Sequence, residues 1–150
     1  MFLKFYLEDE NLIIERHNRN LDKFLYMAVC LCTENGQIVD KSFEINSEKV
    51  LGRNRFNEPI CLTNSMNFSN SLNYAINRIV ALRQDVKIVP NEKLNLNLLI
   101  SVSENKLEAI NNLKECKSEE EILKILEISK VRIEEEMNYL QISSDMAKNY

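Results

Sequence analysis

Residues 23–33, KFLYMAVCLCT, form a run that is apolar at both its odd and its even positions. Successive side chains of a β-strand point to opposite faces of the sheet. A strand of this composition is therefore buried on both faces, which places it in the middle of a sheet with one layer above and one below. Asn35-Gly36 follows directly, and this pair is typical of a type I′ hairpin turn. The sequence predicts a hairpin between residues 23–33 and 37–45.

Two cysteines lie in this run, and their spacing raises the question of a metal or redox site. In the predicted hairpin Cys30 lies opposite Lys41 and Cys32 lies opposite Val39, on a face that also carries Phe43. Both thiols are then small buried apolar groups, which is the usual environment of a free cysteine. A reactive thiol activated by Lys41 stays open as the alternative.

A zinc site would need four ligands. Beyond the pair the chain offers Cys61, Cys116 and the single histidine His17, without the Cys-x-x-Cys or His-x-x-x-His spacing of metal sites. A disulfide between Cys30 and Cys32 is disfavoured because their Cα atoms would lie about 6.7 Å apart, at the far edge of disulfide geometry. We expect no metal and no cofactor.

Hydrophobic periodicity divides the chain into strand-like and helix-like segments. The predicted elements are four antiparallel strands in 1–46, a long loop at 47–64, a central helix at 67–84, a strand at 94–103 paired with 86–89, and helices at 104–115 and 118–141. The last helix opens with a capping box of Ser118 and Glu121. We therefore expect a single α+β domain over 1–150, with an antiparallel β-sheet of about five strands packed by the central helix and a C-terminal helical hairpin.

The chain is acidic, with 23 acidic and 19 basic residues and a net charge of −4. Such a chain has no long-range attraction to phosphate backbones, which disfavours nucleic-acid binding. No stretch is apolar enough to span a bilayer, and the N-terminal segment turns acidic where a signal peptide would continue apolar, which favours a cytoplasmic protein. Richness in Asn, Lys and Ile without Trp indicates an AT-rich genome, such as that of a low-GC bacterium or its phage.

Catalytic motifs are missing from the sequence. His17 has no nucleophile motif beside it, and two glycines in the chain cannot build a phosphate-binding loop. The order of a β-meander, a helix, a strand and further helices resembles the RNase H-like family. The metal-binding aspartate of that family has no counterpart in 23–33, and 94–103 contains no acid, so the resemblance implies a catalytically inactive domain.

Two surfaces have the composition of contact sites. The loop 47–64 interleaves arginines with an aromatic ring, which is typical of binding hot spots, and a nearby turn would extend it with more basic residues. The predicted residues that bind a partner or ligand are Arg53, Arg55, Phe56, Arg16, His17 and Arg19. The predicted self-association stripe on the last helix is Ile122, Leu126, Ile133, Met137 and Leu140.

These features favour a non-enzymatic protein that binds and occludes another protein, such as a small inhibitor, immunity or adaptor protein. An alternative is a sequestering binder of a small anionic ligand such as a nucleotide second messenger, with Arg53, Arg55 and His17 as charged donors. A further alternative is an enzyme whose site is assembled across subunits.

Overall fold

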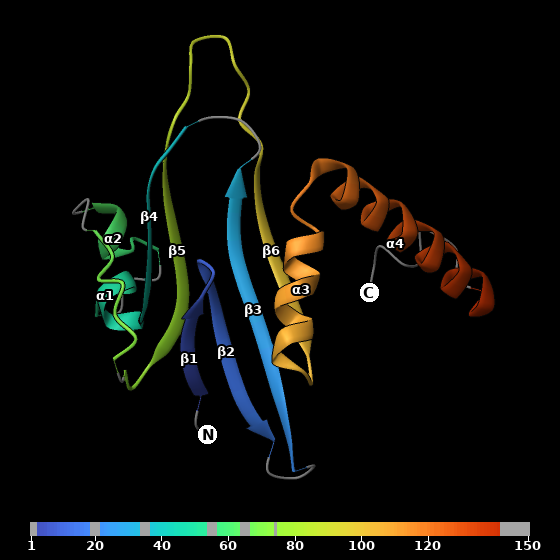
Figure 1. The fold of residues 1–150 in the computed structure, drawn as a ribbon, viewed down its shortest axis with the longest axis horizontal. Coiled ribbons are helices and arrows are strands. Elements are labelled where there is room, and N and C mark those ends of the chain that lie inside the picture. Colours follow the sequence, from blue (N-terminus) through green and yellow to red (C-terminus); the bar gives the residue numbers. More distant parts are fainter. Residues whose placement is uncertain are drawn as a thin grey trace. The chain divides into compact units, whose positions relative to one another are not determined.

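The computed structural model describes residues 3–18, 22–33, 37–53, 57–63, 67–73 and 75–141. Figure 1 shows the order of the helices and strands. They are β1 (Leu3–Glu8), β2 (Asn11–Asn18), β3 (Lys23–Thr33), β4 (Gln37–Asn46), α1 (Ser47–Leu51), α2 (Ile60–Thr63), β5 (Arg78–Lys87), β6 (Leu96–Ser103), α3 (Lys106–Glu115) and α4 (Glu119–Tyr139). The α+β class with antiparallel sheets is confirmed.

Four strands form one antiparallel sheet in the order β1-β2-β3-β6. The turn between β1 and β2 consists of Asp9 and Glu10, both with positive φ, which matches the right-handed twist of the flanking strands. Glu8 and Asn11 face each other across this turn. The predicted central position of 23–33 is confirmed, because β3 pairs with β2 on one side and with β6 on the other.

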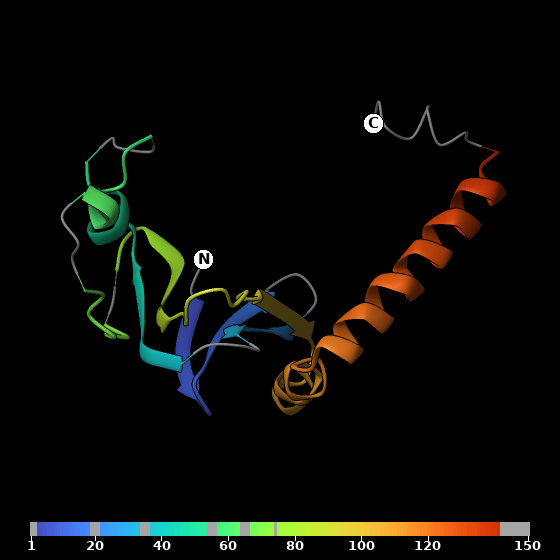
Figure 2. The ribbon, with the colours of Figure 1, turned by 90° about the horizontal axis from the view of Figure 1, so that it is seen from above.

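The four-stranded sheet buries residues on both faces, which explains the doubly apolar composition of β3. On the outer face, Ala28 and Cys30 pack against Ala109, Ile110 and Leu113 of α3. On the inner face lies a second cluster of Leu12, Ile14, Val29, Phe43 and Ile45, in which the last two belong to β4. Figure 2 shows these layers from above, with β4 and β5 on one side of the sheet and α3 on the other.

The predicted hairpin between 23–33 and 37–45 is wrong. β4 leaves the larger sheet and pairs with β5, so that Lys41 lies opposite Gln84 instead of Cys30. Packing decides this outcome. β3 already has two strand neighbours, and the apolar face of β4 gains more burial by covering the inner face of the sheet than by extending its edge. Asn35 and Gly36 lie outside the described residues.

The central helix predicted at 67–84 is also wrong. Residues 67–73 are irregular and β5 occupies Arg78–Lys87. Ile79, Val80 and Val86 are β-branched and favour a strand, and the open edge of β4 offers hydrogen-bond partners that outweigh the weak helical periodicity. The predicted pairing of 86–89 with 94–103 is also wrong, because β5 pairs with β4 and β6 pairs with β3.

The predicted loop at 47–64 contains two short helices, α1 and α2. Asn46 caps α1, because its side chain accepts a hydrogen bond from the backbone N–H of Glu48 at 3.0 Å. The chain then turns at Gly52, whose φ of 72° suits a residue without a Cβ atom. The segment 47–64 therefore contains more regular structure than the predicted loop.

A buried carboxylate fixes the segment after α2 to the smaller sheet. Glu44 is 2% exposed and accepts hydrogen bonds from Ser69 Oγ at 2.6 Å and from the backbone N–H groups of Ser69, Ile45 and Asn46. Burial alone raises the pKa of Glu44, but these hydrogen bonds and the nearby Lys49 together lower it. Glu44 is therefore ionised and holds two chain segments together.

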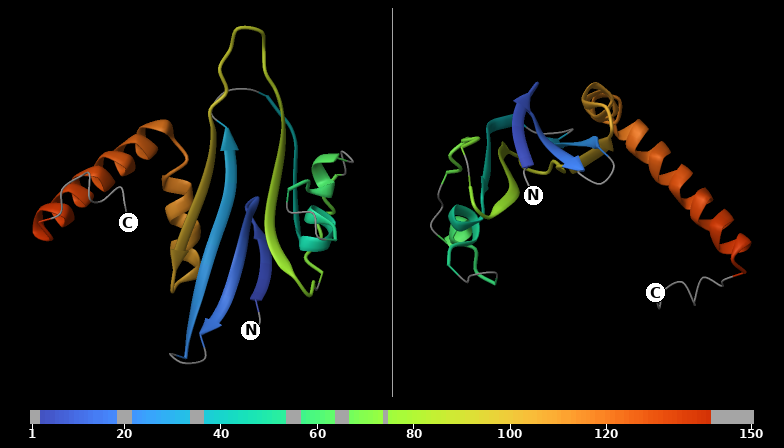
Figure 3. Two further views of the ribbon diagram at one scale, coloured as in Figure 1. Left: turned by 180° about the vertical axis from the view of Figure 1, so that it is seen from behind. Right: turned by 90° about the horizontal axis from the view of Figure 1, so that it is seen from below.

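The two predicted C-terminal helices are present as α3 and α4, and α3 runs beside β6 (Figure 3). The chain divides into two compact units, 1–113 and 114–150, so that α4 belongs to the second. The predicted cap of α4 is confirmed, because Ser118 accepts a hydrogen bond from the backbone N–H of Glu121. The prediction of one domain stays a prediction. None of the helices among the described residues is long and apolar enough to cross a membrane, and a cytoplasmic location also stays a prediction.

Candidate binding pocket between the two sheets

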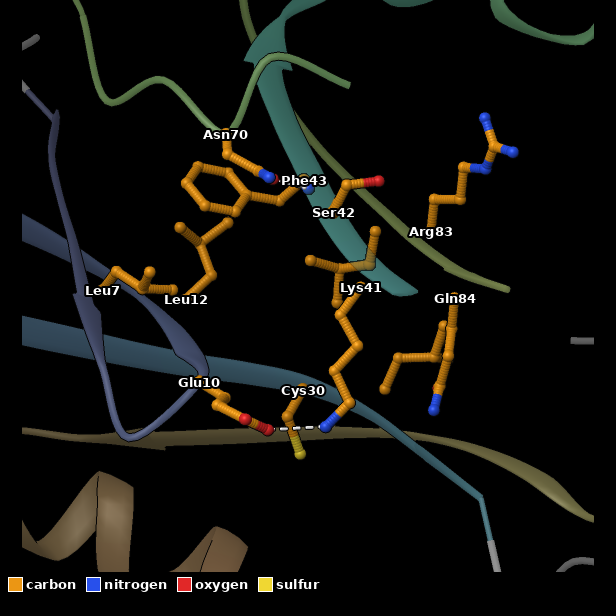
Figure 4. Close-up of a pocket in the computed structure, with 12 residues that line it drawn as sticks. Leu7, Glu10, Leu12, Cys30, Lys41, Ser42, Phe43, Asn70, Arg83 and Gln84 are labelled. Carbon is orange, nitrogen blue, oxygen red and sulfur yellow. Dashed lines mark hydrogen bonds and ion pairs between the residues drawn. The ribbon is translucent and has the colours of Figure 1, made fainter. Parts of the chain in front are cut away.

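A pocket of about 270 Å³ lies between the inner face of the larger sheet and the sheet of β4 and β5. Figure 4 shows ten of its side chains by name. Its lining residues are Leu7, Glu10, Leu12, Cys30, Leu31, Lys41, Ser42, Phe43, Asn70, Leu82, Arg83 and Gln84. The pocket thus draws on β1, β2 and β3 from one layer and on β4 and β5 from the other.

The floor of the pocket is apolar because it continues the inner core. Leu12 and Phe43 are 1% and 6% exposed and approach each other from opposite layers (Figure 4). Leu82 lies opposite Phe43 in the ladder of β4 and β5 and packs against the same cluster. Hydrophobic burial holds these side chains in place, so the floor is formed before any ligand arrives.

An ion pair and an amide form the polar part of the pocket. Lys41 Nζ lies 2.6 Å from Glu10 Oε2, which joins β4 to the turn between β1 and β2. Gln84 faces Lys41 across the ladder. Both the oxygen and the nitrogen of the Gln84 side-chain amide are buried, and neither has a hydrogen-bond partner within the described residues. A buried amide without partners costs about 1–3 kcal/mol, so it indicates a place for a ligand or for water.

The remaining polar residues are already engaged. Asn70 Oδ1 accepts a hydrogen bond from the backbone N–H of Phe43 at 2.7 Å, which fixes the irregular segment to β4. Arg83 and Gln84 extend to opposite sides of β5 (Figure 4). The Arg83 guanidinium donates two hydrogen bonds to Asp85, at 2.9 and 3.1 Å, and these hydrogen bonds raise the pKa of Arg83. The positive charges of the pocket are therefore compensated by carboxylates.

The predicted basic binding residues do not line the pocket. Arg16 and His17 are exposed on β2, where His17 stacks on Phe24 at 4.7 Å and lies 3.2 Å from Asp22 Oδ1. Arg53 is exposed and follows α1. Arg19, Arg55 and Phe56 lie outside the described residues. The structure therefore does not bring the described members of this set together, and their role in binding stays a prediction.

The predicted self-association stripe lies on α4. Leu126, Ile133 and Leu140 are 53–60% exposed, whereas Ile122 and Met137 are partly buried. Self-association through this helix stays a prediction.

None of the four cysteines, which all lie within the described residues, forms a disulfide, and Cys30 is buried as predicted. Cys32 is partly buried, and its thiol contacts the backbone oxygen of Asn97 at 3.6 Å. Across the described residues no group of three or more His, Cys, Asp or Glu side chains is placed to hold a metal ion.

The sequence contains a signal for this pocket in two polar residues at inward strand positions. Lys41 and Gln84 occupy inward positions of strands whose other inward residues include Phe43, Leu82 and Ile45. When two paired strands carry polar side chains at facing positions, these side chains interrupt the apolar face and leave room for a pocket between the layers. This signal can be recognised only when the pairing of β4 with β5 is known.

A comparison with known families finds a match over most of the chain. Residues 1–119 match the family described as glycosyl hydrolase 94, supersandwich domain. No curated protein and no solved structure matches this chain. The matched region contains every strand, α3 and all residues of the pocket.

This match corrects the functional predictions made from the sequence. The prediction of an inhibitor, immunity or adaptor protein is wrong, since the matched family is a domain of carbohydrate-active proteins. The alternatives of an anion-sequestering protein and of an RNase H-like domain are corrected with it. The RNase H-like order also fails in the structure, because a strand stands where its helix was expected. Since the match covers 119 of the 150 residues, the chain belongs to the glycosyl hydrolase 94 supersandwich domain family.

Proposed function

We propose that this chain binds one uncharged sugar unit in the pocket between its sheets, as a non-hydrolytic domain of a carbohydrate-active protein. The side-chain amide of Gln84, which has no hydrogen-bond partner within the described part of the chain, carries this proposal. A carboxamide donates and accepts hydrogen bonds, and sugar hydroxyls do both as well. The apolar floor of Leu12, Phe43 and Leu82 offers a surface for the C–H groups of a sugar ring.

The charges of the pocket favour a neutral ligand. Lys41 is paired with Glu10, and Arg83 is paired with Asp85. An anion would have to compete with these carboxylates for its donors, whereas a polyol can accept from Lys41 and donate to Glu10 without separating them. Neutral sugars fit this arrangement better than phosphates.

The number of carboxylates in the pocket favours sugar binding over glycoside hydrolysis. Glycoside hydrolysis uses two carboxyl groups about 5–9.5 Å apart on either side of the bond that is cleaved. Glu10 is the one acid among the lining residues, and it already forms an ion pair. A pair of this kind would therefore have to come from elsewhere in a larger protein.

The test is a titration of the isotope-labelled chain with glucose and cellobiose, followed by two-dimensional NMR. A monosaccharide has about a dozen non-hydrogen atoms, so at about −0.3 kcal/mol per atom we expect a Kd in the millimolar range. The shifted amide signals should come from β4, β5 and the turn between β1 and β2. Shifts scattered over the surface, or none at saturating sugar, would contradict the proposal.

The decisive variant is Gln84→Leu, which keeps the side-chain size and removes the amide. We expect it to lose sugar binding and to raise the free energy of unfolding by about 1–2 kcal/mol, because a buried polar group without partners disappears. Gln37→Leu, at an exposed position of β4, is the matched control and should change neither quantity by a comparable amount. A Gln84→Leu chain that still binds sugar would show that the amide has another role.

A further inference from the structure

Asn70 lines the pocket from an irregular segment, 67–73, that is hydrogen-bonded to β4. Its backbone N–H donates to the carbonyl oxygen of Phe43 at 3.1 Å, and its side-chain Oδ1 accepts from the backbone N–H of Phe43 at 2.7 Å. Asn70 adopts a φ of 52°, a conformation that asparagine tolerates better than most residues. One residue thus satisfies both backbone groups of Phe43, which holds the Asn70 side chain at the rim of the pocket.

Neighbouring contacts hold this segment in place before any ligand arrives. Ser69 Oγ donates to the buried carboxylate of Glu44 at 2.6 Å, and Asn67 Oδ1 accepts from Arg83 Nη1 at 3.2 Å. Asn70 is therefore preceded by two anchored residues. A hydrogen-bonding group that is already ordered loses less entropy when it binds a ligand. The segment thus presents Asn70 to the pocket as a preorganised contact.

The contact with Phe43 leaves one half of the Asn70 amide for a ligand. The backbone N–H of Phe43 can only donate, so the amide oxygen of Asn70 is the atom that faces it. The Nδ2 group takes no part in either hydrogen bond to Phe43. This group can donate but cannot accept. A ligand that meets Asn70 in the pocket must therefore present an acceptor oxygen to it.

Asn70 and Gln84 flank β4 from opposite edges. Asn70 binds the backbone of Phe43 on the edge that faces away from β5, whereas Gln84 lies on β5 and faces Lys41. Figure 4 shows both amides among the side chains around the pocket. The hydroxyls of a sugar ring point in several directions, and each can donate and accept. One sugar ring below β4 can therefore use both amides.

We propose that Asn70 is a specificity-determining residue of the sugar site, which donates from Nδ2 to an oxygen of the ligand while Gln84 binds the ligand from the other edge of β4. This inference rests on the proposed function and names a second contact of the same site. Because the oxygen of Asn70 is held by Phe43, the amide cannot turn to offer an acceptor instead. The site therefore selects a polyhydroxylated ring with an acceptor oxygen on the side of Asn70.

The test is an NMR titration of the full chain with cellobiose as the probe. Asn70→Asp keeps an oxygen for the N–H of Phe43 and replaces the Nδ2 donor by a second acceptor. We expect this variant to raise the Kd for cellobiose by about tenfold, because one hydrogen bond is lost and two acceptors then face each other. The protection of the Phe43 amide proton against exchange should stay unchanged, because the contact that anchors Asn70 remains.

Two further variants separate the ligand contact from the anchor. Asn70→Gly suits the positive φ and removes the whole amide, so it should weaken cellobiose binding and also speed amide exchange at Phe43. Asn73→Asp makes the same change of charge at an exposed position of the segment that does not line the pocket, and it should leave the Kd unchanged.

The outcomes distinguish this inference from the proposed function. An Asn70→Asp chain that binds cellobiose as tightly as the original, while Gln84→Leu does not bind it, would overturn the inference and leave the proposed function intact. Equal weakening by Asn70→Asp and Asn73→Asp would also overturn it, since the added charge would then explain the loss. If the original chain itself shows no saturable shifts, the proposed function fails and this inference fails with it.

Discussion

Replacing Glu44 by glutamine tests the electrostatic reasoning most directly. The substitution keeps the size of the side chain but turns one hydrogen-bond acceptor into a donor. In the native chain the two carboxylate oxygens receive four hydrogen bonds, of which the one from Ser69 Oγ is the shortest at 2.6 Å. A new N–H group in this position faces the N–H of Ser69 or those of Ile45 and Asn46, so at least one donor loses its partner.

The magnitude follows from burial and charge. A hydrogen bond to a charged group contributes about 1.5–3 kcal/mol, and a buried donor left without a partner costs about 1–3 kcal/mol. Glu44 is 2% exposed, so water does not replace the lost contacts. Lys49 adds little, since its side chain is half exposed and lies 3.7 Å away. We expect Glu44→Gln to lower the free energy of unfolding by about 2–3 kcal/mol near pH 7.

The pH dependence gives a second, independent signature. The folded-state pKa of Glu44 lies below the ordinary value of 4.5, so the stabilisation is fully present above pH 4.5 and is lost as the pH falls through the folded pKa. Urea unfolding followed by circular dichroism should therefore show a difference between Glu44→Gln and the original chain that is constant near neutral pH and shrinks in acid. Glu92→Gln, at an exposed position, is the control and should change stability by less than about 0.5 kcal/mol. A difference below about 1 kcal/mol at neutral pH, or one that persists unchanged in acid, would refute the reasoning.

Two further predictions concern the helices. Leu113→Ala should lower the free energy of unfolding, measured by denaturant titration, by about 2–4 kcal/mol, because Leu113 is 2% exposed in the outer core. Leu107→Ala changes a residue of the same helix that is 68% exposed, and it should change this free energy by less than about 0.5 kcal/mol. Equal effects of the two variants would show that α3 does not cover the sheet as described. Ser118→Ala should cost α4 about 1 kcal/mol through loss of its cap, visible as faster amide exchange at residues 119–122, and Ser129→Ala in the helix interior should not produce this change.

Local patterns determined the type of most elements. The first four strands, both C-terminal helices and the cap at Ser118 follow from short-range rules, since hydrophobic alternation, turn residues and helix caps act over a few neighbouring residues. The central position of β3 was also predictable, because its apolar residues on both faces need two layers to cover them.

The residues of the candidate pocket were not predictable in the same way. An arginine-rich loop looks like a contact surface in any sequence, but in the structure Arg16 lies on β2 and Arg53 follows α1, and neither lines the pocket. Gln84 looks ordinary in the sequence, and only the structure places it opposite Lys41 with no hydrogen-bond partner for its side chain among the described residues. Such information is a property of contacts between distant segments and not of local composition.

By itself, the sequence determined the α+β class, the doubly buried strand β3 and the strand near residues 94–103. Only the tertiary structure decided that β4 turns away to pair with β5, that 78–87 is a strand and that the pocket forms between the two sheets. The physical reason is that pairing between strands is set by competition for hydrogen-bonding edges and for apolar area. Partners far apart in the sequence decide that competition, and segments such as β5 take the structure that their neighbours in space stabilise.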